Sequence, residues 1–184
     1  MALTLREETV ETGKFWETWG ASALLGQTKC TMPKADATVP NFHGNFSYGI
    51  DESRRVMVPA KWRPKNRNVL FTVVLWPIEI EDFLLVLPPE RWRVMLDKLK
   101  TKSLQDRRVA ALERVIGSTS AQLTLDSVGR FCLPETLTMP AEIDKEATFV
   151  GRLDKFEIWS PKRLQVSAPQ DKSLAASVAQ EIDL

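Results

Sequence analysis

Two stretches of the chain share the spacing Asp-x-x-x-Arg-x-x-x-Pro. Residues 51–63 read DESRRVMVPAKWR, and residues 126–134 read DSVGRFCLP. The shared positions are Asp51, Arg55 and Pro59 in the first stretch and Asp126, Arg130 and Pro134 in the second. A motif that recurs with the same spacing indicates an internal repeat, in which one local structure is built twice.

The residue types of this motif suggest what it does. An aspartate at the end of a strand can accept backbone N–H bonds or pair with an arginine four residues later. We therefore expect Asp51 and Asp126 to stabilise turns, with Gly129 at a position that needs positive φ. Arginine makes planar, bidentate contacts with phosphates and base edges, so Arg55 and Arg130 are candidates for DNA contact. The alternative is that each arginine is a salt-bridge staple of its own turn.

Basic residues surround the first turn. Residues 54–67 contain six Lys and Arg residues and no acidic residue, although the net charge of the whole chain is only +1. A local basic surface can bind phosphate even when the net charge is near zero. The candidate phosphate contacts beside Arg55 are Arg54, Lys61, Arg63, Lys65 and Arg67. A solvated basic face is the alternative interpretation.

The sequence disfavours an enzyme and a metal protein. The single histidine, His43, has no nucleophile or acid arranged around it, and neither a P-loop nor a metal-ligand spacing is present. Cys30 and Cys132 are isolated, which fits a reducing cytosol better than a disulfide scaffold or a zinc site. No apolar run approaches the roughly 20 residues of a membrane helix, and we see no signal peptide. We expect no cofactor and no membrane.

The expected elements place the motifs at strand ends. Alternating residues predict strands over 45–50 and 55–60, which we expect to form a hairpin around the first turn. Further strands are expected at 69–76, 82–88, 121–126 and 131–134, with a last pair within 147–159. Helical periodicity predicts a helix over 88–100 and a second one that starts at Ser103 and stops at Gly117.

These elements group into five segments. They are an N-terminal extension and linker at 1–41 with a weak helix at 4–19, a first repeat at 42–88, a helical connection at 89–119, a second repeat at 120–163 and a tail at 164–184. Each repeat is too small to bury its own core. The prediction is a mainly β fold with helices (α+β), in which two pseudo-symmetric repeats form a β-barrel with peripheral helices. The two turns would then lie on the same side.

The chain resembles the MraZ family of bacterial transcription regulators over about residues 42–165. The resemblance depends on FHGNFSYGID at 42–51, on the two Asp-x-x-x-Arg turns, on VPAKWR at 58–63, and above all on GRLDKFEIW at 151–159. It departs at Ser53 and Arg54, where the family usually has Lys-Gly. Loss of that glycine predicts a different geometry for the first turn.

The resemblance implies a double-split, AbrB-like barrel made of two SpoVT/AbrB-like modules, and a ring-like homo-oligomer. It implies binding to double-stranded DNA at promoter direct repeats and repression of the operon for cell division and cell-wall synthesis. Arg55 and Arg130 would read the DNA, in the cytoplasm and at the nucleoid.

Two rival functions remain open from the sequence. One is an AbrB-like, antitoxin-like module that binds protein and has no specific DNA target. The other is an enzyme that uses the barrel as a scaffold, which predicts a concave pocket with converging polar groups.

Overall fold

The computed structural model describes residues 41–78, 81–102 and 106–182. The chain divides into two units, Met1–Lys34 and Ala35–Leu184, and all the described residues belong to the second. The expected N-terminal helix at 4–19 and the linker up to residue 40 lie outside the described residues.

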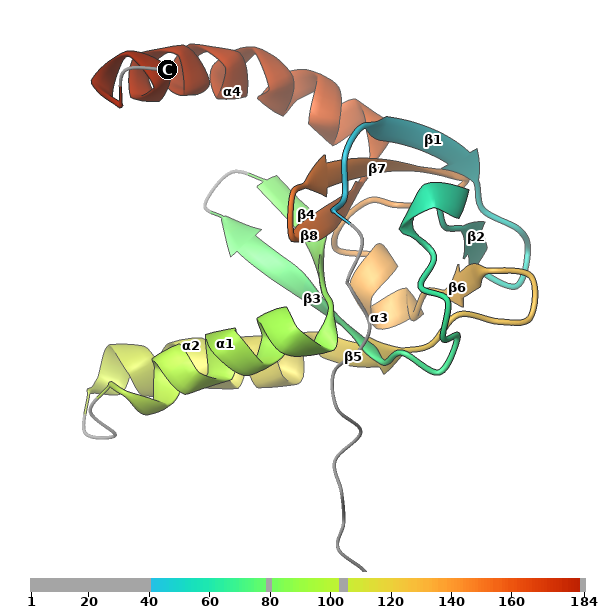
Figure 1. Cartoon of the computed structure of the whole chain (residues 1–184), viewed down its shortest axis with the longest axis horizontal. Coiled ribbons are helices and arrows are strands. Elements are labelled where there is room, and N and C mark those ends of the chain that lie inside the picture. The colour runs from blue at the N-terminus through green and yellow to red at the C-terminus, as the bar shows by residue number, and fades with distance from the viewer. Residues whose placement is uncertain (1–40, 79–80, 103–105, 183–184) are drawn as a thin grey trace, which may run out of the picture. The chain divides into compact units, whose positions relative to one another are not determined.

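The described part is an α+β structure with two antiparallel sheets, as the sequence predicts for the fold class. The larger sheet has six strands in the order β1-β7-β8-β4-β3-β5, and the smaller sheet pairs β2 with β6 (Figure 1). The strands are β1 Asn45–Gly49, β2 Arg55–Met57, β3 Phe71–Ile78, β4 Glu81–Leu87, β5 Ser120–Leu123, β6 Arg130–Cys132, β7 Glu146–Arg152 and β8 Lys155–Trp159.

The order of the strands relates the first half of the fold to the second. If β1–β4 are exchanged with β5–β8, the order of the six-stranded sheet reads the same from its other end. β4 and β8 then meet at its middle, while β2 and β6 pair with each other. Strands of both halves are therefore mixed in one sheet, and neither half has a sheet of its own.

The prediction that residues 45–50 and 55–60 form a hairpin is wrong. β1 pairs with β7 and β2 pairs with β6, so the first turn is closed by the single bridge between Ile50 and Val56. The reason is burial, because Val56 lies opposite Phe131 and both side chains are fully buried. Such a pairing across 75 residues cannot be seen in a pattern that compares only neighbours.

An aromatic core supports this arrangement. Trp62, on the short 3-10 helix η1 (Ala60–Trp62), packs edge-on against Phe42 and tilted against Phe156. Phe131 of β6 stacks 6.5 Å from Phe156, measured between ring centroids. Residues that flank both turns thus share one core with the middle of the large sheet.

Helices cover the other face of β3, β4 and β8. Trp92, Met95 and Leu99 pack there, as the helical period predicts for α1 (Pro89–Lys100). Ile116 of α2 (Arg107–Ser118) and Leu164 of α4 (Pro161–Glu181) join the same cluster. Among the described residues no helix is long and apolar enough to cross a membrane.

The limits expected for the second helix are wrong. The helix starts at Arg107, where the Asp106 carboxylate accepts the backbone N–H of Arg108 at 2.9 Å, and it continues through Gly117 to Ser118. Ser103 lies outside the described residues. A glycine inside a helix costs only about 1 kcal/mol relative to alanine, which neighbouring packing can offset.

We predict that Gly151→Ala destabilises the fold. A Cβ on Gly151 would lie 2.6 Å from the carbonyl carbon of Phe42, and overpacking against backbone costs about 1–3 kcal/mol. The matched control is Gly117→Ala, because a Cβ there meets nothing within 4 Å and the helix gains propensity. Urea unfolding of both variants tests this, and equal stability of the two would contradict it.

Candidate nucleic-acid interface

One carboxylate organises the second turn. The Oδ1 atom of Asp126 accepts the backbone N–H groups of Val128, Gly129 and Arg130, each at 2.9 Å. The backbone N–H of Asp126 donates to the carbonyl of Arg130 at 3.0 Å and closes the turn. These bonds hold the pKa of Asp126 down, mainly through the N–H of Arg130, at about 2 instead of 3.8. The charged carboxylate is therefore part of the turn.

The first turn has the same construction. The Oδ1 atom of Asp51 accepts the backbone N–H groups of Ser53 at 3.0 Å and Arg55 at 2.8 Å. The N–H of Asp51 donates to the carbonyl of Arg55 at 3.0 Å, as in the second turn.

The prediction that the first turn has a different backbone geometry from the second is wrong. Arg54 stands at the fourth position, where the second turn has Gly129, and it keeps the left-handed backbone with φ of +56° against +95° at Gly129. Its N–H donates to the backbone carbonyl of Asp51 at 2.8 Å, as the N–H of Gly129 donates to the backbone carbonyl of Asp126 at 3.0 Å. A non-glycine residue in this conformation costs about 1–2 kcal/mol, and the bonds to Asp51 offset that cost.

The two arginines of the motif stand on the outer face of the β2–β6 ribbon. Side chains alternate between the faces of a strand, so the burial of Val56 and Phe131 turns their neighbours outward. Arg55 lies opposite Cys132, and Arg130 lies opposite Met57. The arginines are thus diagonal neighbours across the ribbon, which is within reach of long side chains.

The surroundings of Arg130 and Arg55 differ. Arg130 donates through Nε to Oδ2 of Asp126 at 2.8 Å and through Nη1 to Oδ2 of Asp51 at 3.4 Å, and its side chain is 28% exposed. It therefore links the two turns. Arg55 is exposed, and within the described ranges its guanidinium has neither a hydrogen bond nor an ion pair.

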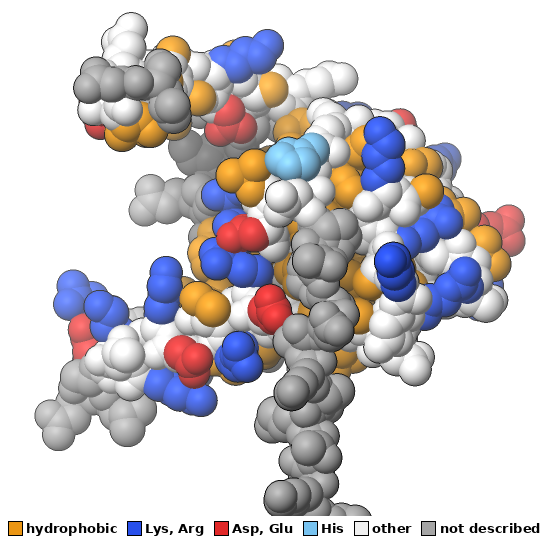
Figure 2. Space-filling view, in the orientation of Figure 1, with side chains coloured by type: hydrophobic (Ala, Val, Ile, Leu, Met, Phe, Trp, Pro, Cys, Tyr) orange, Lys and Arg blue, Asp and Glu red, His pale blue; other side chains and the backbone are white. Residues whose placement is uncertain are grey.

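Further basic side chains reach the turns from the segment after β2. The Nε of Arg63 donates to the carbonyl of Val58 at 2.8 Å, and its Nη1 donates to Val128 in the second turn at 3.4 Å. Arg67 donates to the carbonyl of Ser127 in the same turn. Figure 2 shows Lys and Arg side chains gathered where Figure 1 draws η1, β2 and β6.

The structure places most of the residues predicted from the sequence on or beside the two turns. They differ in exposure and in hydrogen bonding. Lys61 and Lys65 are exposed, whereas Arg63 is half-buried by its bonds to backbone. Sequence reasoning missed Glu135, whose carboxylate accepts Arg54 at 2.6 Å. The available signal was its position directly after the motif proline Pro134, where the first repeat has an alanine.

This arrangement presents donors and positive charge. Within the described residues, no three or more His, Cys, Asp or Glu side chains form a group that could hold a metal ion. An outward ribbon with arginines on it suits contact with an anion-rich partner.

We predict that the free energy of unfolding decreases at acidic pH because Asp126 becomes protonated. Its folded pKa lies below the ordinary value, so its contribution is present above pH 4 and is lost as the pH falls from 3.8 toward about 2. Asp126→Asn should be less stable at neutral pH and lose less stability over that window. Thermal unfolding from pH 7 to pH 2 measures both effects.

Asp144→Asn is the matched control, because Asp144 is exposed and no described residue forms a hydrogen bond or ion pair with its carboxylate. If Asp126→Asn and wild type lose stability in parallel below pH 4, the carboxylate does not hold the turn.

The chain is similar to regulators from several bacteria. It is 30% identical over 137 residues to the transcriptional regulator MraZ of Actinobacillus pleuropneumoniae serotype 3 (strain JL03), covering 74% of this chain and 90% of that protein. It is 28% identical over 123 residues to the same regulator of Clostridium tetani (strain Massachusetts / E88), covering 66% of this chain and 83% of the relative. A family model described as "MraZ protein", with the addition that it is antitoxin-like, matches residues 118–183.

Proposed function

The chain belongs to the MraZ family of transcriptional regulators, and from this premise we propose that its two turns form one DNA-binding face. The observation that carries this is the β2–β6 ribbon, which presents Arg55 and Arg130 on its outer face. The major groove of B-DNA is wide enough for a two-stranded ribbon, and arginine is the side chain that most often reads guanine there. The family is one of regulators, so the function is not enzymatic.

The roles of the basic residues follow from their exposure and from the hydrogen bonds that their side chains already make. Arg55 is exposed and can present its whole guanidinium to a base edge. Arg130 can reach a base only if it gives up a carboxylate, so its contact is coupled to the turns. Arg54, Lys61 and Arg63 lie around the ribbon and contact phosphates, which set position and salt dependence. Asp51, Asp126 and Gly129 hold the turns and do not touch DNA.

The finer functional picture rests on the family resemblance. The protein represses the operon for cell division and cell-wall synthesis through upstream direct repeats, in the cytoplasm and at the nucleoid. Residues 42–88 and 120–163 are two SpoVT/AbrB-like repeats of one double-split barrel. The strand order of the large sheet supports this division, because it reads the same from either end when β1–β4 are exchanged with β5–β8.

Self-association would make the DNA-binding face multivalent. Each chain carries two turns, and copies held in a ring convert later DNA contacts into intramolecular ones. Exposed apolar residues on the helices are candidate contacts between copies. They are Val94, Leu112, Val115, Val166, Leu174 and Val178.

A second candidate is an antitoxin-like protein-binding module, which the description of the matching family model favours. The two functions differ in their response to salt. Phosphate-dominated binding weakens steeply as salt rises, whereas an apolar protein interface does not.

We predict that Arg55→Ala loses about 1–3 kcal/mol of specific binding free energy and relaxes sequence preference, because a base contact is removed. Arg130→Ala loses a similar amount and also lowers thermal stability, because it frees two carboxylates. Arg54→Ala weakens operator and scrambled duplexes about equally and lowers the salt slope by about one unit.

Titration of the chain with its upstream DNA and with a scrambled duplex, at several salt concentrations, measures all three effects. Unchanged operator binding by both Arg55→Ala and Arg130→Ala would mean that these arginines serve only the fold.

We predict an assembly larger than a dimer at micromolar concentration. Replacing Leu174 and Val178 together with Lys should reduce its mass, since both side chains are exposed on one face of α4. Ser173→Lys, an exposed position on the same helix, is the control. Sedimentation analysis decides, and a monomeric wild type that binds a single DNA repeat tightly would refute the ring.

A further inference from the structure

The two turns pack against opposite halves of the fold in different ways. At the second turn the fourth residue is Gly129, and a Cβ there would lie 2.7 Å from Cδ and Nε of Arg63. The missing side chain thus leaves room for an arginine that follows η1. At the first turn the fourth residue is Arg54, which extends its own side chain to Glu135 of α3 (Glu135–Thr138).

The backbone of both turns is anchored alike. The N–H of Val58 donates to the carbonyl of Gly129 at 3.1 Å, and the N–H of Leu133 donates to the carbonyl of Arg54 at 2.9 Å. The difference in what the two turns contact therefore lies in side chains and not in the backbone. In the second turn the backbone carbonyls of Val128 and Ser127 accept hydrogen bonds from Arg63 and Arg67. In the first turn Arg54 donates to the carboxylate of Glu135.

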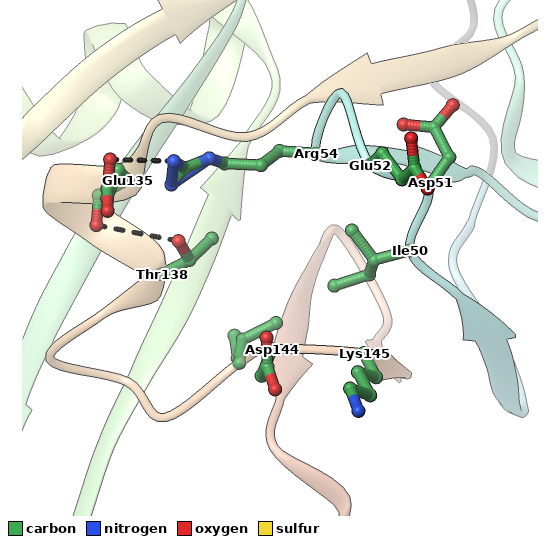
Figure 3. Close-up of a pocket in the computed structure, with 9 residues that line it drawn as sticks. Ile50, Asp51, Glu52, Arg54, Glu135, Thr138, Asp144 and Lys145 are labelled. Atoms are coloured by element: carbon green, nitrogen blue, oxygen red, sulfur yellow. Dashed lines mark hydrogen bonds and ion pairs between the residues drawn. The ribbon is translucent and has the colours of Figure 1, made fainter.

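The contact between Arg54 and Glu135 is short but open to water. Nη2 of Arg54 lies 2.6 Å from Oε2 of Glu135, and the two side chains are 43% and 63% exposed. A pocket of about 450 Å³ lies beside them, lined also by Ile50, Thr138 and Lys145. Figure 3 shows Arg54 reaching along the edge of this pocket to Glu135. An exposed pair of this kind is worth only about 0–1 kcal/mol, so a stronger anion can replace the carboxylate.

We propose that Glu135 competes with DNA phosphate for the Arg54 guanidinium, so that the first turn exchanges a carboxylate for a phosphate when DNA binds. The proposal rests on the DNA-binding function proposed above and adds to it the residue that limits affinity. In the free protein Glu135 neutralises one positive charge of the DNA-binding face. Binding must break that pair, which lowers affinity for every sequence because phosphates carry no sequence information.

The neighbouring acids do not have this role. Asp51 and Asp126 use their carboxylates on the backbone of the turns and on Arg130. Glu52 is exposed on the first turn, and no described residue pairs with its carboxylate. Glu135 is thus the acid beside the turns whose described ion-pair partner is a proposed phosphate contact.

The test is a cycle of the variants Glu135→Gln, Arg54→Ala and the double variant. We expect Glu135→Gln to bind the upstream duplex and the scrambled duplex roughly two- to fivefold more tightly at low salt, which is the strength of an exposed ion pair. In the Arg54→Ala background the same substitution should have no such effect. Glu52→Gln also removes one negative charge beside Arg54 and is the matched control, with an effect that does not depend on Arg54.

Each outcome decides the matter. If Glu135→Gln tightens binding only when Arg54 is present, the competition is supported. Equal tightening with and without Arg54, or no more tightening than Glu52→Gln produces, overturns it and makes Glu135 a bulk charge. Weaker binding by Glu135→Gln also overturns it, because the carboxylate would then position Arg54 for DNA. A wild type that binds neither duplex rejects the DNA-binding function itself, and the inference falls with it.

Discussion

The pairing of β2 with β6 is the contact on which the rest of the interface depends. It places Val56 against Phe131 in the core, and both side chains are fully buried. Because each strand has three residues and directly follows its turn, this single pairing also brings the two turns together. Arg130 can then reach the carboxylates of both turns. Burial of two apolar residues therefore sets the position of the charged groups.

The same pairing explains why the two halves of the fold are not independent. A three-residue strand has too few backbone bonds to stand alone, and each half lends its short strand to the other. The large sheet repeats this exchange, since β1 pairs with β7 and β5 pairs with β3. A change in either turn therefore affects both halves of the fold.

Similar backbones with different side chains give the two turns different tasks. The carboxylates of Asp51 and Asp126 impose nearly the same hydrogen bonds on both. The fourth position then decides what each turn contacts, because Gly129 leaves space for Arg63 and Arg54 projects to Glu135. An internal repeat can in this way keep its fold while its two copies diverge in electrostatics.

The sequence by itself determined the α+β class, the strand positions, the amphipathic face of α1 and the candidate residues of the two turns. These follow from local rules: periodicity marks burial, and the spacing of Asp and Arg marks a turn. It did not determine that β2 pairs with β6 instead of β1, that Arg130 joins both aspartates, or that Arg54 keeps a left-handed backbone and pairs with Glu135. The pairings among these features join residues far apart in the chain, and the backbone of Arg54 is held by the turn that they anchor. Only the tertiary structure decided them, because they depend on which buried surfaces meet, and a sequence pattern records the surfaces without their partners.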